Sequence, residues 1–153
     1  VPGLDKGESK LGKGVALSLM DSSVIANRGL FKVLRDICQE KNIPFTIASA
    51  SIKPNIDFFV ESFQLERWFD PAKIVYDDGS YANKVKMFEH AAEVIGVPVE
   101  ECLILEDSDS GIRDAYAAGC RNIVVVDSMG VAEKHVGKPG VKQIIKSFEE
   151  LEY

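Results

Sequence analysis

Acidic and hydroxyl side chains follow the short apolar runs of this sequence, and such side chains can bind a cation or a phosphate. The first run ends at Asp21, the second at Ser49, and the fourth at Glu106 and Asp107. Carboxylate oxygens are the ligands that Mg²⁺ prefers, whereas hydroxyl groups and a nearby lysine suit the oxygens of a phosphate. Because Asp and Ser are also common helix caps, the alternative for each position is that it only caps the next helix.

These side chains would meet only if the apolar runs are neighbouring strands of one sheet. The runs have the length of strands and are apolar nearly throughout, which is typical of parallel strands covered on both faces. They comprise residues 15–20, 44–48, 73–76, 102–105 and 122–126. Since ligands bind at the carboxyl ends of the strands in such sheets, the residues that follow the runs are the candidates for a functional site.

Between the runs, apolar residues recur at the spacing of a helix face. The five stripes are Leu30, Val33, Leu34, Ile37 and Cys38; Ile56, Phe59, Val60 and Phe63; Val85, Phe88, Ala92 and Ile95; Ile112, Ala115 and Ala118; and Val141, Ile144, Ile145, Phe148 and Leu151. Five strands that alternate with five helices predict an α/β fold, a three-layer, Rossmann-like, doubly wound sheet of five parallel strands.

Length and composition indicate one ordinary globular domain over residues 1–153. The chain has 46% hydrophobic and 27% charged residues and a net charge of −6, which argues against nucleic acid as a partner. No apolar run approaches the roughly 20 residues of a membrane helix, and the first residues lack the apolar centre of a signal peptide. The three cysteines have no C-x-x-C spacing, so we expect buried free thiols in a cytoplasmic protein.

Residues 102–119, CLILEDSDSGIRDAYAAG, resemble the fourth motif of the haloacid dehalogenase (HAD) superfamily in its β-phosphoglucomutase-like branch. Ser49 in IASAS matches the second motif of that superfamily. Lys84 in YANKVKMF matches the third motif, and Lys86 is the less favoured register. The resemblance extends from about residue 29 to residue 151.

The resemblance implies a Mg²⁺-dependent phosphatase or phosphotransferase that acts through an aspartyl-phosphate on a small phosphorylated substrate. It implies that Asp21, Glu106 and Asp107 hold the Mg²⁺, that Ser49 binds the transferring phosphoryl group and that Lys84 screens its charge. It also implies the strand order 3-2-1-4-5, although a flavodoxin-like order, 2-1-3-4-5, would accommodate the same five units.

The first motif departs from the pattern of the superfamily, Asp-x-Asp-Gly-Thr, in which the first Asp is the nucleophile and the second is the general acid/base. The only candidate is LMDSS. If Asp21 is the second Asp, then Leu19 stands in the place of the nucleophile. If Asp21 is the nucleophile, then Ser23 replaces the acid/base. Residues 21–28 also leave no room for a cap domain, so we expect activity to be weak or lost.

Residues 10–45 resemble a different family, the dinuclear-metal aminopeptidases of the tetrahedral, glutamyl type, without the metal ligands of that family. The two resemblances meet near residues 43–49. They predict a chimera, natural or engineered, in which an aminopeptidase-like strand–helix segment (1–45) precedes a HAD-like core (46–153). The alternatives are a natural HAD protein with a degenerate first motif, and a receiver-like binding module. Asp127 and Ser128 argue against the receiver, which needs a lysine after the fifth strand.

Overall fold

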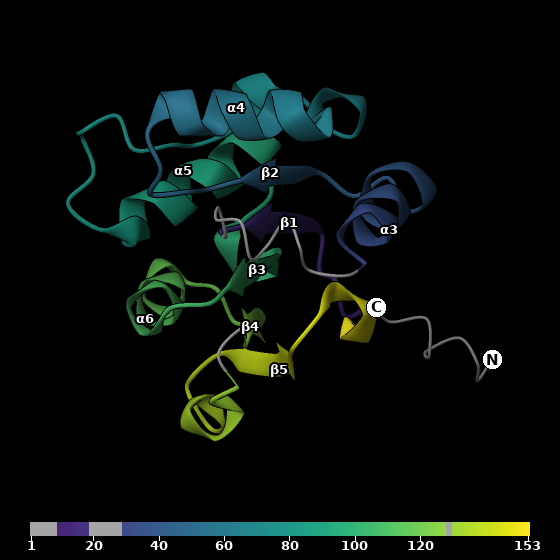
Figure 1. The fold of residues 1–153 in the computed structure, drawn as a ribbon. Helices are drawn as coiled ribbons and strands as arrows, with labels where there is room; N and C mark the ends of the chain where they lie inside the picture. The colour runs from purple at the N-terminus through teal and green to yellow at the C-terminus, as the bar shows by residue number, and fades with distance from the viewer. Residues whose placement is uncertain (1–8, 19–28, 128–129) are drawn as a thin grey trace.

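The computed structural model describes residues 9–18, 29–127 and 130–153, and these form a five-stranded parallel sheet with helices on both faces (Figure 1). The strands are β1 (Gly14–Leu17), β2 (Phe45–Ile47), β3 (Cys102–Glu106), β4 (Ile123–Val126) and β5 (Val141–Ile145). Their spatial order is β2-β1-β3-β4-β5. Every residue of the first four strands is buried, which explains why their sequences are apolar almost throughout.

The helices are α3 (Leu30–Arg35), α4 (Lys53–Phe63), α5 (Lys84–Ile95) and α6 (Asp109–Ala118). A π-helical turn (Asp36–Glu40) extends α3, and short 3₁₀ turns lie at Leu65–Arg67, Pro71–Lys73, Val99–Glu101, Ala132–His135 and Phe148–Glu150. Alternate residues of the strands pack against α3 and α4 on one face and against α5 and α6 on the other. Figure 1 shows α3 on one side of the sheet and α5 and α6 on the other. The predicted three-layer fold with five parallel strands is confirmed.

The predicted third strand, residues 73–76, is reduced to a single point of pairing. Val75 bridges Ala48 in parallel, and Val75 N donates to Ile47 O at 2.9 Å. The 3₁₀ turn Pro71–Lys73 precedes this bridge and leaves too few extended residues for a strand. The bridge nevertheless lies beyond β2, as the order 3-2-1-4-5 of the predicted strands requires. The flavodoxin-like alternative, with residues 73–76 beside β1, is wrong.

The predicted last helix, residues 141–151, is also wrong, because Val141–Ile145 form β5 and pair with β4. Ile144 packs on the α5–α6 side of the sheet and Ile145 on the α3–α4 side. Consecutive apolar residues of this kind fit both a helix stripe and a strand covered on two faces, so their spacing could not decide between them. The β-branched side chains favour the strand.

Two further predictions concern the cap and the domain organisation. The predicted absence of a cap concerns residues 21–28, which lie outside the described residues. The single domain over 1–153 stays a prediction. Among the residues that the structure describes, no helix is both long and apolar enough to cross a membrane.

The packing of α4 allows a first quantitative prediction. Phe59 is 5% exposed and its ring centroid lies 5.4 Å from that of Phe63. Phe59→Ala removes this ring from the core and leaves a cavity, so the free energy of unfolding in urea should fall by about 3 kcal/mol. The neighbouring Phe58 is 73% exposed, and Phe58→Ala is therefore the control. Equal losses in both variants would contradict the assignment of the buried face.

The cysteine thiols give a second prediction. All three are free; Cys102 and Cys120 are buried and Cys38 is partly buried, as expected. Burial raises the pKa of Cys102 to about 12 and the pKa values of Cys38 and Cys120 to about 11. Since only the thiolate reacts, modification by an aromatic disulfide reagent at pH 8 should be about 100-fold slower in the native than in the urea-unfolded protein. The native rate should rise steadily as the pH approaches 11. A fast native phase at pH 8 would disprove the assignment.

Candidate functional site

A buried carboxylate, a lysine and a serine meet at the carboxyl ends of β1 and β3. Glu106, the last residue of β3, is 0% exposed. Its Oε2 accepts hydrogen bonds from Ser18 Oγ at 2.6 Å and from Lys84 Nζ at 2.9 Å. Lys84 Nζ also donates to Ser18 Oγ at 3.1 Å. These three side chains, which we call the central triad, therefore form a closed triangle across three elements of the fold.

The other oxygen of Glu106 is held by Asp107 and Ser108, the two residues that precede α6. Its Oε1 accepts from Asp107 N at 2.8 Å, from Ser108 N at 3.2 Å and from Ser108 Oγ at 3.4 Å. Ser108 caps α6 by accepting from Gly111 N at 3.0 Å. A Cβ at Gly111 would lie only 2.1 Å from Glu106 Oε2, so the carboxylate occupies the space that a side chain there would need.

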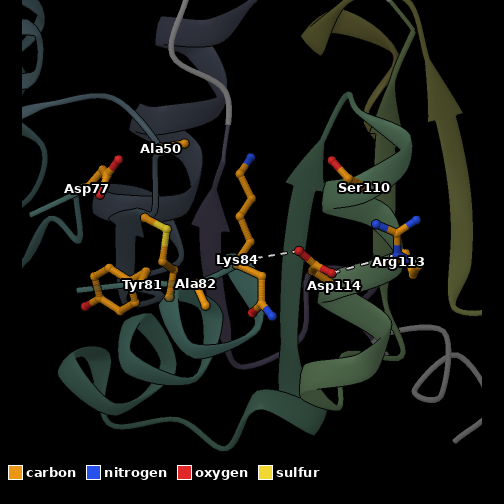
Figure 2. Close-up of a pocket in the computed structure, with 10 residues that line it drawn as sticks. Ala50, Asp77, Tyr81, Ala82, Lys84, Ser110, Arg113 and Asp114 are labelled. Carbon is orange, nitrogen blue, oxygen red and sulfur yellow. Dashed lines mark hydrogen bonds and ion pairs between the residues drawn. The ribbon is translucent and has the colours of Figure 1, made fainter. Parts of the chain in front are cut away.

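The cap of α5 places Lys84. Asn83 Oδ1 accepts from Val85 N at 2.9 Å and so starts the helix. Lys84 N donates to Asp114 Oδ2 of α6 at 3.1 Å, which ties the two helices together. Figure 2 shows the Lys84 side chain extended away from this contact, and Arg113 on the other side of Asp114. The ammonium group thereby reaches the ends of β1 and β3.

The triad lies where the direction of strand succession reverses. The chain passes from β1 to β2 on one side, whereas β3 lies on the other side of β1. Such a point leaves a crevice at the carboxyl ends of the strands, where α/β sheets bind their ligands. Its position therefore favours a functional role for the triad.

One cavity borders the triad, and a second borders Asp107, the residue after Glu106. One of about 590 Å³ is lined by Lys84, Tyr81, Ser110 and Arg113, among other residues (Figure 2). Another of about 300 Å³ is lined by Asp107, Ser108, Asp127 and His135, among others. Lys84 thus borders one cavity and Asp107, which is half-buried, borders the other.

The structure brings together some of the predicted site residues. Lys84 and Glu106 form an ion pair, and Asp107 follows directly in the chain. Ser49 is buried just after β2, where its Oγ accepts from Ser51 N at 3.1 Å; no hydrogen bond between described residues joins its side chain to the triad. Lys86, the less favoured register of the third motif, is 77% exposed and pairs with Glu89.

The predicted residue Asp21 lies outside the described residues. In residues 9–18, 29–127 and 130–153, no three His, Cys, Asp or Glu side chains converge as metal ligands. Ser18 was missed by the sequence analysis, although it is a polar residue directly after the apolar residues Val15, Ala16 and Leu17. That polarity at a strand end was the available signal.

Comparisons with known proteins point to two families. The sequence pattern of the M42 glutamyl aminopeptidase family matches residues 1–53, which fits the aminopeptidase-like segment. A HAD hydrolase of family IA, variant 3, from Entamoeba histolytica is 29% identical, with a TM-score of 0.76 over 82% of this chain and 56% of that chain. CbbY from Rhodobacter sphaeroides, in complex with phosphate, is 24% identical, with a TM-score of 0.64 over 82% of this chain and 55% of that chain.

A curated relative, the plasmid protein CbbY of Cupriavidus necator, is 26% identical over 101 residues. The match covers 64% of this chain and 40% of the relative. The chain therefore covers between 40% and 56% of the length of these three proteins.

Proposed function

The chain has the fold of HAD-superfamily hydrolases, as its motifs predicted, and on this premise we propose that it is a Mg²⁺-dependent phosphatase or phosphotransferase core with weak or no turnover. Its ligand would be the phosphoryl group of a small phosphorylated compound. The observation that carries the proposal is the Lys84–Glu106 ion pair at the reversal point of the sheet, with Asp107 beside it.

Lys84 and Ser49 are the proposed contacts of the phosphoryl group. Phosphoryl transfer depends mainly on positioning and on neutralising the charge of the equatorial oxygens. Lys84 borders the larger cavity, so an anion bound there would lie near its ammonium group. The hydroxyl group of Ser49, at the neighbouring strand end, would supply a hydrogen bond.

Asp107, Glu106 and Asp21 are the proposed Mg²⁺ ligands, and the cation would offset the charge of the bound phosphoryl group. Oxygen donors of this kind suit Mg²⁺, which often binds only one or two carboxylates and keeps several waters. Asp107 fits this role because it is half-buried and borders a cavity. Glu106 already accepts five hydrogen bonds and would have to release one of them, so Asp107 is the ligand whose loss should matter most.

Low turnover follows from the first motif. In neither register of LMDSS do Asp residues occupy both motif positions, and Asp21 would have to serve alone as nucleophile or as acid/base. A site that binds both cation and phosphate but lacks one of these groups would lose either the nucleophile that forms the aspartyl-phosphate or the acid–base assistance to the leaving group.

A second candidate function is that of a chimeric or engineered scaffold without evolved catalysis. The observation in its favour is that the M42 pattern ends at residue 53, so it includes β1, α3 and β2, whereas β3 begins the fourth HAD motif. Under this alternative the carboxylates at the strand ends are inherited without a substrate.

The test is Mg²⁺-dependent hydrolysis of an aryl phosphate, together with calorimetric titration of Mg²⁺ and inorganic phosphate. Asp107→Asn should weaken Mg²⁺ binding and leave the fold intact, because it relieves carboxylate repulsion. Asp57→Asn is the matched control, because Asp57 lies on the exposed face of α4. Binding without turnover, or turnover that needs both Mg²⁺ and Asp107, supports the proposed core. If the protein shows neither binding nor turnover, the result favours the scaffold without evolved catalysis.

A further inference from the structure

The charges of the central triad cancel. Glu106 contributes one negative charge, Lys84 one positive charge and Ser18 none. The hydroxyl of Ser18 donates to Glu106 and accepts from Lys84, so it uses its donor and one of its acceptor sites within the triad. A buried pair that is neutral overall and rich in hydrogen bonds needs no further counter-ion.

Glu106 also has little freedom to turn toward a cation. Its two oxygens accept five hydrogen bonds from three segments of the chain. The Cα of Gly111 closes the side toward α6, because even a methyl group there would overlap the carboxylate. In this arrangement Glu106 anchors Lys84 and Ser18 rather than presenting an oxygen to the cavity.

Ser18 stands at the point where β1 ends beside Glu106. Leu17 pairs with Leu105, and Ser18 N donates to Leu105 O at 2.9 Å. Ser18 and Glu106 are therefore in register at the carboxyl ends of β1 and β3. A carboxylate in place of the Ser18 hydroxyl would face Glu106 Oε2 at about hydrogen-bond distance, and among the described residues only the Lys84 ammonium contacts both positions. Two carboxylates so placed must share a proton or bind a cation.

We infer that Ser18 is the residue that weakens cation binding at this centre: its neutral hydroxyl leaves the Lys84–Glu106 pair balanced, so Glu106 can join Asp107 as a Mg²⁺ ligand only by giving up one of its hydrogen bonds. The inference deepens the proposed function and rests on it, since the Mg²⁺ affinity of the wild-type chain would then depend mainly on Asp107 and Asp21. Weak cation binding follows because Ser18 adds no negative charge to the site, and the affinity of oxygen sites for cations is sensitive to the charge of their ligands.

The experiment compares Ser18→Asp with Ser18→Asn, because the Asn side chain has nearly the same size as the Asp side chain but no charge. Thermal unfolding is followed over a Mg²⁺ titration, with NaCl at matched ionic strength as the blank. Without Mg²⁺, Ser18→Asp should melt several degrees below Ser18→Asn. Mg²⁺ should restore it, with an apparent affinity at least about tenfold tighter than that of the wild type or of Ser18→Asn.

Three outcomes would overturn the inference. These are an equal response of the two Ser18 variants to Mg²⁺, a wild type that binds Mg²⁺ as tightly as Ser18→Asp, and a Ser18→Asp protein that stays unfolded in Mg²⁺ while Ser18→Asn folds. Failure of the proposed function looks different. It would appear in the wild-type background, as an absence of phosphate binding and as an Asp107→Asn variant that titrates with Mg²⁺ like the wild type.

Discussion

Gly111→Ala is expected to lower the free energy of unfolding by about 4 kcal/mol, the reverse of what the same change does in most helices. Alanine in a helix interior is normally favoured over glycine by about 1 kcal/mol. Here the new Cβ would lie 2.1 Å from Glu106 Oε2 and 2.2 Å from its Cδ. The carboxylate is fully buried, so it could move aside only by giving up its partners without reaching water, which costs about 3–5 kcal/mol.

Urea unfolding measures this change, and Ser110→Ala is the control. Ser110 is an exposed residue in the same first turn of α6. Its substitution should change the free energy of unfolding by less than about 0.5 kcal/mol. If Gly111→Ala were as stable as the control, the carboxylate of Glu106 would have to lie elsewhere. A structure of the variant in which Lys84 and Ser18 keep their contacts with Glu106 would contradict the prediction in the same way.

The sequence predicts β1 to β4, because their apolar runs are continuous and too short for a helix, and it predicts the helices that carry a single apolar stripe. It does not predict the element at Val141–Ile145, where Ile144 and Ile145 cover opposite faces of the sheet and mimic a helix stripe. It also predicts a full strand at residues 73–76, where the structure has a single bridging residue, because the two have the same apolar composition. Both failures occur at the edges of the sheet, where fewer neighbours constrain the chain.

The candidate site is predicted in part for a similar reason. Glu106, Asp107 and Lys84 occur in motifs whose letters can be recognised, whereas Ser18 is one small polar residue among apolar neighbours. The importance of Ser18 depends on the register between β1 and β3, which sets it beside Glu106. Register is a property of paired strands, and one strand alone does not reveal it.

Lys84→Met is expected to lower the free energy of unfolding by about 4 kcal/mol, because it leaves the buried charge of Glu106 without its counter-ion. Glu106→Gln should cost less, about 2 kcal/mol, because the lysine left behind is 20% exposed and can turn toward water. The double variant should then be no less stable than Lys84→Met alone. The sum of the two single losses should therefore exceed the loss in the double variant by about 2 kcal/mol, as for residues in direct contact.

Lys86→Met is the matched control for this cycle, since Lys86 lies on the same helix but is 77% exposed and pairs with Glu89 on the surface. Its loss should change the free energy of unfolding by less than about 1 kcal/mol, and salt should remove that small effect. The coupling between Lys84 and Glu106 should persist in high salt, because ions do not reach a carboxylate that is buried. Additive losses at Lys84 and Glu106, or a coupling that disappears with salt, would show that the pair is solvated. The weak cation binding inferred for this centre would then lose its physical basis, because a solvated Glu106 could turn to a metal as easily as Asp107.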